Sequence, residues 1–130
     1  MNIPPKQITD LGLNLLVNTE KLRPLPIQEQ EFRMEDLVWH LDIPVWAKDG
    51  TDDWNLTPRN VIDKTEGSAG HYERMMKSDT QFPLLLRRYN ERLVIVDGVH
   101  RLTKLFLEGK DSVKAKLIPE GTLLNDEYKS

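Results

Sequence analysis

The sequence predicts an α+β fold, with a small mixed sheet and flanking helices in a single compact domain. Two apolar runs of strand length, residues 83–88 and 92–96, are joined by the short connection Tyr89-Asn90-Glu91, and this arrangement is typical of a β-hairpin. The second run leads directly into amphipathic helical spacing over residues 99–108, and residues 113–117 then alternate between apolar and polar. A chain of 130 residues is long enough for one core and too short for two.

Composition narrows the classes of function. The 18 basic and 21 acidic residues give a net charge of -3, so overall electrostatics do not favour nucleic acid as a partner, although a local basic patch would still bind it. No apolar run approaches the roughly 20 residues that span a bilayer, and the opening MNIPPKQITD lacks the features of a secretion signal. We therefore expect a cytoplasmic protein without membrane contact. The absence of cysteine excludes disulfides and thiolate metal sites.

The first element, over residues 1–29, reads as an N-terminal arm. Ile8, Leu11 and Leu15 recur at helical spacing and predict a helix from about residue 7 to residue 17, after which two prolines at 24 and 26 force an extended connection. The arm either packs on the flank of the domain or is exchanged between protomers. It lies outside the main domain at 30–124, and we expect deletion of residues 1–22 to leave ligand binding within a few-fold.

Within the main domain the elements follow in order. A short strand is expected at residues 30–34, followed by one helical turn and an extended segment, with Trp39 and Trp46 in packing positions. Thr57 and Pro58 mark the start of a helix, as N-cap and first helical residue. A second helix is expected from residue 71 to about 77, and residues 125–130 form a frayed tail.

The stretch VIVDGVHRLTKLFLEG, residues 94–109, carries the chemistry. It predicts a strand, a turn at Asp97-Gly98 and a helix, so the free N–H groups of the first helical turn lie at the end of a strand beside an imidazole and a guanidinium. Unpaired N–H groups, the positive end of the helix dipole and a fixed cation form a phosphate site. The candidate phosphate-binding residues are Gly98, Val99, His100, Arg101 and Lys104. The alternative is an ordinary turn, with a structural His100 and a solvated Arg101.

Two candidate catalytic residues lie just before the extended segment that contains Pro44. His40 and Asp42 are candidate catalytic residues, because a carboxylate opposite a phosphate site suits general-base or Mg²⁺ chemistry. The alternative is that both are simply exposed. Residues 48–53 contain three aspartates but lack the downstream glutamate of a calcium loop, so no metal-binding residues are predicted.

The letters DGVHR before a helix, with the strand VKAKLIPEGTL after it, resemble the signature of the ParB/sulfiredoxin superfamily. The order of FRMEDLVWHLDIPVW, TPRNVI and HYERMMKSDTQFPLLLRRYNERL is similar to that of the family's earlier strand and helices, so the resemblance covers roughly residues 32–124. It implies that Gly98, His100 and Arg101 hold nucleotide phosphates. Sulfiredoxin has its catalytic cysteine directly before the histidine, where this chain has Val99, so that thiol chemistry is excluded.

The resemblance implies a nucleotide-binding domain, with Mg²⁺ and ATP or another nucleotide as ligands. Since the family includes a free-serine kinase, one expectation is an Mg-dependent phosphotransferase in which Asp42 activates the acceptor hydroxyl. One alternative is a non-catalytic, nucleotide-binding accessory in DNA partition or regulation, and another is a ParB-like nuclease. The sequence does not decide whether the chain is an enzyme or which nucleotide it binds. It does not decide the oligomeric state of the protein either.

Overall fold

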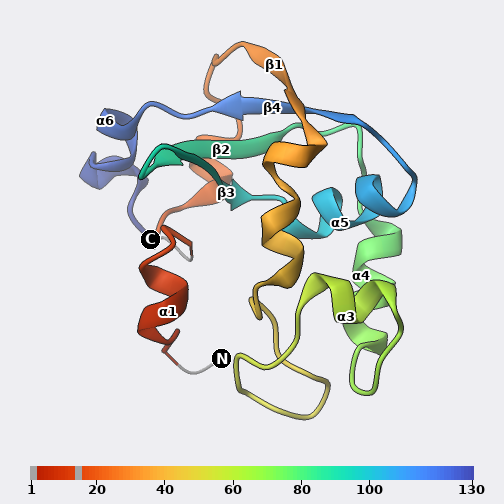
Figure 1. Ribbon diagram of the computed structural model, residues 1–130. Helices are drawn as coiled ribbons and strands as arrows, with labels where there is room; N and C mark the ends of the chain where they lie inside the picture. Colours follow the sequence, from red (N-terminus) through yellow and green to blue (C-terminus); the bar gives the residue numbers. More distant parts are fainter. Residues whose placement is uncertain (1–2, 14–15) are drawn as a thin grey trace.

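The computed structural model describes residues 3–13 and 16–130 as a single α+β domain built on a four-stranded mixed sheet (Figure 1). The strands lie in the spatial order β1-β4-β2-β3. Both outer pairs are antiparallel, and the central pair, β4 and β2, is parallel. Their bounds are Glu29–Arg33 for β1, Leu84–Tyr89 for β2, Arg92–Asp97 for β3 and Ser112–Leu117 for β4.

The central strand β2 is covered on both faces, as its continuous apolar run predicts. Leu84 and Leu86 belong to the main core, whereas Leu85 points into a second cluster with Leu22 and Ile118. Burial on both faces explains why the run does not alternate with polar residues. The strand β4 does alternate, with Val113 and Ala115 buried, and this also confirms the sequence prediction.

Helices cover the sheet and extend beyond one end of it. Figure 1 shows α3, α4 and α5 grouped together below this end, where they contact one another. The α-helices are α1 (Lys6–Thr9), α2 (Thr19–Leu22), α3 (Pro58–Ile62), α4 (Ala69–Lys77), α5 (Val99–Leu107) and α6 (Glu120–Leu123). The short 3-10 helices are η1 (Met34–Asp36), η2 (Val38–Asp42) and η3 (Asp126–Tyr128).

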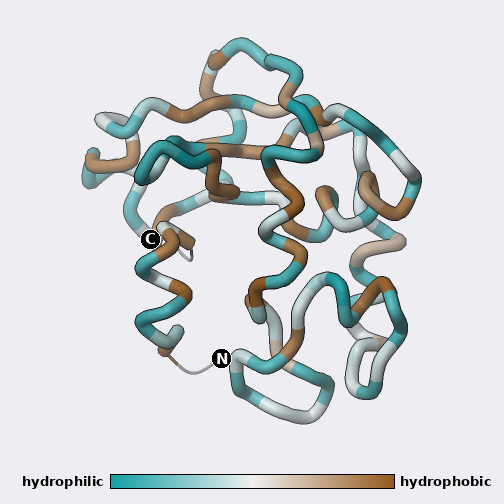
Figure 2. Tube along the Cα trace, in the orientation of Figure 1, coloured by the Kyte–Doolittle hydropathy of each residue, from teal (hydrophilic) through white to brown (hydrophobic). Residues whose placement is uncertain are grey.

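The start of α3 follows the sequence prediction closely. The Thr57 hydroxyl accepts a hydrogen bond from the N–H of Asn60 at 3.0 Å, the Asn60 side chain accepts one from the N–H of Thr57 at 2.9 Å, and Pro58 is the first helical residue. This reciprocal cap satisfies two amides that have no partner within the helix. Figure 2 shows brown, hydrophobic stretches within the sheet and the helices, and mostly white and teal chain in the loop before α3.

The N-terminal segment differs from its predicted form. The helix α1 has only four residues rather than extending from residue 7 to 17, and residues 14–15 of the predicted helix lie outside the described residues. Gly12 has φ of +85°, which ends helical geometry. Ile8, Leu13 and Leu22 are nevertheless buried, so the segment packs on the domain.

The C-terminal residues are also ordered against the domain, which differs from the expected frayed tail. They contain η3, and Val17 pairs with Lys129 in an isolated antiparallel bridge. The N–H of Asn18 donates to the carbonyl of Tyr128 at 2.7 Å. The two ends of the chain therefore support each other.

Across the described residues, each helix falls short of the length and apolar character required to cross a bilayer.

Candidate functional site

The turn between β3 and α5 has the predicted strand-turn-helix form. Strand β3 ends at Asp97, Gly98 is the N-cap with φ of +120°, and α5 begins at Val99. A Cβ at position 98 would lie 2.5 Å from a methyl carbon of Leu84 and 2.9 Å from Nη2 of Arg101. Both the backbone conformation and the lack of space therefore require glycine here.

The first turn of α5 leaves three backbone donors without an acceptor. Within the part of the chain that the structure describes, no hydrogen bond is made by the N–H groups of Val99, His100 and Arg101, and the first helical bond runs from Leu102 N–H to the carbonyl of Gly98 at 2.9 Å. Unpaired amides and the helix dipole together favour an anion at this point. Val99 would contribute through its backbone, because its side chain packs against the core.

A pocket of about 320 Å³ lies over this turn. It brings together four of the predicted phosphate-binding residues with residues from two other parts of the chain. The lining residues are Arg23, Ser78, Asp79, Phe82, Asp97, Gly98, Val99, His100 and Arg101. A volume of this size is at the lower end of the range for small-molecule sites.

One carboxylate oxygen holds two arginines at the wall of this pocket. Oδ2 of Asp97 accepts hydrogen bonds from Nε of Arg23 and from Nη2 of Arg101, each at 2.9 Å. The Arg101 side chain is only 13% exposed, so its position is well defined. The hydrogen bond with Asp97 raises the pKa of Arg23 above its ordinary value. Because a guanidinium has five N–H donors, both arginines keep donors for a ligand.

His100 is neutral at pH 7 rather than a second cation. Its Nε2 lies 3.0 Å from Nδ1 of His71, and its ring stacks on Trp46 with centroids 4.2 Å apart. Burial, followed by the neighbouring charges of His71 and Arg74, lowers the pKa of His100 to about 4. Burial also lowers the pKa of His71. The positive charge beside the helix N-terminus therefore comes from Arg101 and Arg23.

Lys104 does not line the pocket. Its ammonium donates to the carbonyls of Met76 at 2.8 Å and Ser78 at 2.9 Å, where α4 ends. A lysine at the C-terminal end of a helix satisfies carbonyls that lack helical partners and complements the dipole. The contacts of Lys104 thus fix the loop after α4 instead of reaching the turn at Gly98.

The two candidate catalytic residues lie away from this pocket. His40 is fully buried in η2, where Nδ1 donates to the carbonyl of Leu37 at 2.7 Å and Nε2 accepts from the N–H of Ile95 at 3.0 Å. Burial lowers its pKa to about 4. Asp42 has a side chain that is 62% exposed, and it pairs with Nε of Arg59 at 2.7 Å. The structure therefore does not bring either residue to the turn at Gly98.

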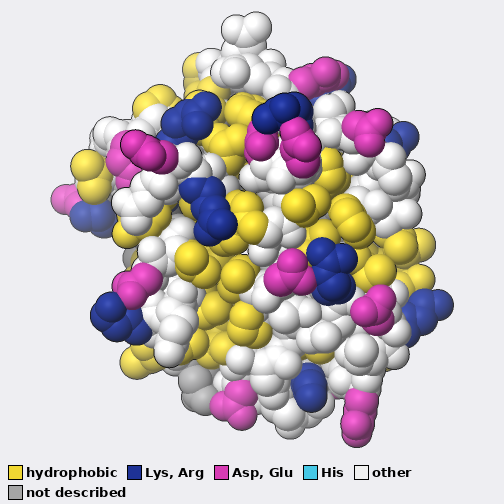
Figure 3. Space-filling model, in the orientation of Figure 1, with side chains coloured by type: hydrophobic (Ala, Val, Ile, Leu, Met, Phe, Trp, Pro, Cys, Tyr) yellow, Lys and Arg dark blue, Asp and Glu magenta, His cyan; other side chains and the backbone are white. Residues whose placement is uncertain are grey.

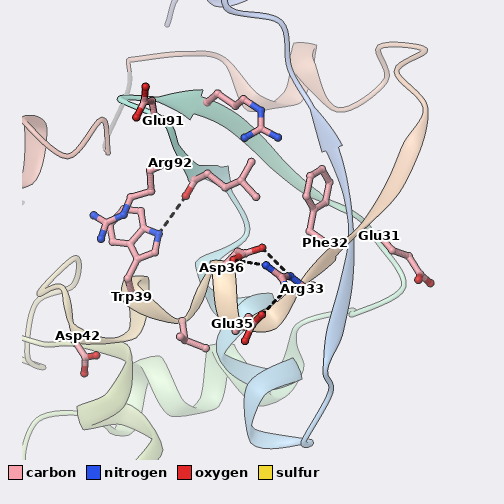
Figure 4. A pocket seen from close by; sticks show the side chains of 12 residues that line it. Glu31, Phe32, Arg33, Glu35, Asp36, Trp39, Asp42, Glu91 and Arg92 are labelled. Carbon is pink, nitrogen blue, oxygen red and sulfur yellow. Dashed lines mark hydrogen bonds and ion pairs between the residues drawn. The ribbon is translucent and has the colours of Figure 1, made fainter.

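Asp42 borders a second, larger pocket of about 730 Å³, whose lining residues are drawn in Figure 4. Three of the charged groups there pair with one another, since Arg33 bonds to Glu35 at 2.8 Å and to Asp36 at 3.3 Å. Arg92 lies 4.0 Å from the centre of the Trp39 ring. The face seen in Figure 3 mixes positive and negative side chains without a large patch of one sign.

Sequence reasoning missed Arg23, Asp79 and Phe82 as pocket residues. Arg23 lies in the presumed arm, 74 positions before its partner Asp97, and no local pattern links the two. Asp79 and Asp97 are the two carboxylates among the lining residues, and Asp42 is not one of them. Among the described residues there is no group of three or more histidine, cysteine, aspartate or glutamate side chains suited to a metal ion.

Comparison with models of protein families, with curated proteins and with solved structures gives no match.

Proposed function

We propose that this chain is a nucleotide-binding domain of the ParB/sulfiredoxin type, which binds the phosphates of its ligand at the N-terminus of α5. The observation that carries the proposal is the geometry of the turn at Gly98. Three amides of the first helical turn have no hydrogen-bond partner among the described residues, and they belong to residues that line the pocket. Arg101 packs closely against Gly98, and Arg23 shares the carboxylate of Asp97 with it. Such a combination suits an anion with several acceptor oxygens.

Asp97 has a defined part in this proposal. It orients both guanidiniums and uses one N–H of each, so their remaining donors are available to phosphate oxygens. His100, being neutral, would contribute its backbone amide and a ring surface rather than charge. The resemblance of DGVHR to the superfamily signature points to the same three residues, Gly98, His100 and Arg101.

Phosphoryl transfer with Mg²⁺ is the second candidate function, and Asp79 favours it. Mg²⁺ is commonly held by one or two carboxylates together with substrate phosphates. The carboxylate of Asp79 lines the pocket, and although Oδ1 accepts a bond from the N–H of Gln81 at 3.0 Å, Oδ2 makes no hydrogen bond within the described residues. Asp79 is therefore the residue that would hold Mg²⁺, which would neutralise charge on the phosphates. Asp42, predicted to activate the acceptor hydroxyl, lies outside this pocket.

A non-catalytic, nucleotide-binding accessory role stays open on the same geometry, because it requires only the phosphate site. The nuclease alternative has no observation in its favour, since the described residues lack the cluster of metal ligands that a two-metal nuclease uses.

The proposal is tested by thermal unfolding with ATP, ADP, CTP or GTP, each with and without Mg²⁺. Binding to the folded state alone stabilises by about 2.7 kcal/mol when the ligand exceeds its Kd a hundredfold, which is readily seen as a rise in Tm. Release of phosphate or ADP from ATP, with free serine among the acceptors, tests the transfer step separately.

The variant Arg101→Ala should reduce nucleotide binding by about 2–3 kcal/mol, the scale of hydrogen bonds to charged groups. Arg101→Lys should recover only part of this, because an ammonium lacks the planar fork of a guanidinium. Arg59→Ala is the matched control, since Arg59 also pairs with an aspartate but lies outside the pocket. No Tm shift with any nucleotide or with inorganic phosphate would contradict the proposal. So would an Arg101→Ala protein that binds normally.

A further inference from the structure

The pocket over the turn contains one large apolar side chain at the surface. Phe82 is 62% exposed, although phenylalanine is normally buried, and it lines the same pocket as Gly98 and Arg101. The other side chains of this pocket are mostly polar or charged. An exposed aromatic ring beside an anion site gives the pocket one apolar surface and one positive surface.

The loop that carries Phe82 is held in place from two sides. Lys104 donates to the carbonyl of Ser78 at 2.9 Å, which fixes the start of the loop to α5. Asp79 then forms a tight turn, in which its side chain accepts from the N–H of Gln81 at 3.0 Å and its carbonyl from the N–H of Phe82 at 3.3 Å. The ring is therefore presented on an ordered loop, which lowers the entropic cost of binding a ligand against it.

We propose that Phe82 is the stacking surface for the base of a nucleotide whose phosphates lie at the first turn of α5. This inference rests on the proposed function and adds the recognition of the base to it. A base presents a flat π-face, and stacking on an aromatic side chain tolerates any base because each has such a face. The site is thus a nucleotide site of low base selectivity, in which the aromatic ring supplies affinity and the turn fixes the phosphates.

The experiment compares nucleoside triphosphates with inorganic tripolyphosphate, which has the same phosphate chain and no base. Dissociation constants for ATP, CTP, GTP and tripolyphosphate are measured by calorimetry on the parent protein and on Phe82→Ala, Phe82→Leu and Phe82→Trp. Leu124→Ala is the matched control, because Leu124 is also a strongly exposed apolar residue but lies outside this pocket.

We expect Phe82→Ala to weaken all three nucleotides by about tenfold, the scale of a base-stacking contact, and to leave tripolyphosphate unchanged. Phe82→Leu should behave like the alanine variant, because apolar bulk without a ring does not stack. Phe82→Trp should bind nucleotides at least as tightly as the parent protein, and Leu124→Ala should bind all four ligands normally.

Two failures are distinguishable. If the parent protein binds neither the nucleotides nor tripolyphosphate, the phosphate site is wrong and the stacking inference falls with it. If the parent protein binds both kinds of ligand, and Phe82→Ala changes nucleotide affinity no more than tripolyphosphate affinity, the phosphate site stands and the stacking inference is overturned.

Discussion

Nε2 of His40 accepts a hydrogen bond from the backbone N–H of Ile95 at 3.0 Å. Within the described residues β3 lies at one edge of the sheet, so this amide has no neighbouring strand. The indole of Trp39 makes the companion contact and donates to the carbonyl of Leu93 at 3.2 Å, one of the dashed lines in Figure 4. Two side chains of η2 thus occupy the positions of a missing strand, which protects the edge from pairing with another chain.

This relationship predicts a stability defect when His40 is replaced. His40→Leu removes the acceptor and leaves the buried N–H of Ile95 unpaired, while the carbonyl of Leu37 keeps only its bond from the backbone N–H of residue 40. We therefore expect the free energy of unfolding to fall by about 2–4 kcal/mol. Urea unfolding at pH 7 measures the change. Asp42→Asn, in the same 3-10 helix but exposed, should cost less than about 0.5 kcal/mol. A His40→Leu protein of parental stability would contradict this role.

The same burial predicts that stability falls under mild acid. The pKa of His40 is lowered to about 4 in the folded protein from an ordinary value of 6.5, so between these values the unfolded chain binds more protons than the folded one. Stability should therefore be fully present above pH 6.5 and decrease as the pH falls towards 4. For His40 alone the loss between pH 7 and pH 5 should be about 2 kcal/mol.

The lowered pKa of His100 acts in the same direction. Urea unfolding of the parent protein and of His40→Gln, at pH 7 and at pH 5, separates the contributions. The glutamine does not titrate, so the variant should lose less stability between the two pH values than the parent. Equal losses in both proteins would show that His40 does not control this dependence.

The elements that the sequence predicts correctly are those set by local patterns. The hairpin of β2 and β3, the alternation in β4, the cap at Thr57 and the start of α5 after Gly98 all depend on residues close together in the chain. The predicted helix from residue 7 fails because tertiary packing overrides its spacing. Gly12 adopts a positive φ, and a Cβ there would lie 2.6 Å from the ring of Tyr89, a residue far along the chain.

The candidate site was predictable only where it is contiguous. The turn carries its own signal in Asp97, Gly98 and Arg101, whereas the role of His40 depends on an amide 55 positions away. Lys104 lies one helical turn after Arg101 and therefore reads as a second cation for the phosphate. Its actual contacts depend on where α4 ends relative to α5, which no local pattern reveals.

Asp97 offers a test of how charge is distributed at the site. Asp97→Asn keeps an oxygen acceptor for Arg23 and Arg101 but removes the negative charge that lies next to the proposed phosphate. We expect the affinity for tripolyphosphate to rise by several-fold, with the larger gain at low ionic strength because added salt screens charges near the surface. Calorimetry at two salt concentrations measures it. A loss as large as that of Arg101→Ala would instead show that the ion pairs, rather than the net charge, determine binding.

A variant of Lys104 distinguishes the phosphate-binding role predicted from the sequence from the loop-anchoring role that its contacts indicate. If its ammonium bound phosphate, Lys104→Met would weaken tripolyphosphate and nucleotides alike. Because it instead holds the carbonyls of Met76 and Ser78, the variant should free the loop that carries Phe82.

We therefore expect Lys104→Met to lower ATP affinity by several-fold, within the tenfold scale of the stacking contact, and to leave tripolyphosphate affinity within twofold of the parent protein. Lys110→Met, an exposed charge just after α5, controls for the loss of one positive charge and should change neither affinity by more than twofold. Hydrogen exchange should show faster opening of the loop amides in Lys104→Met, since these amides depend on a fixed loop. An equal loss of affinity for ATP and tripolyphosphate, with unchanged hydrogen exchange of the loop amides, would contradict the anchoring role. It would indicate instead that Lys104 binds phosphate.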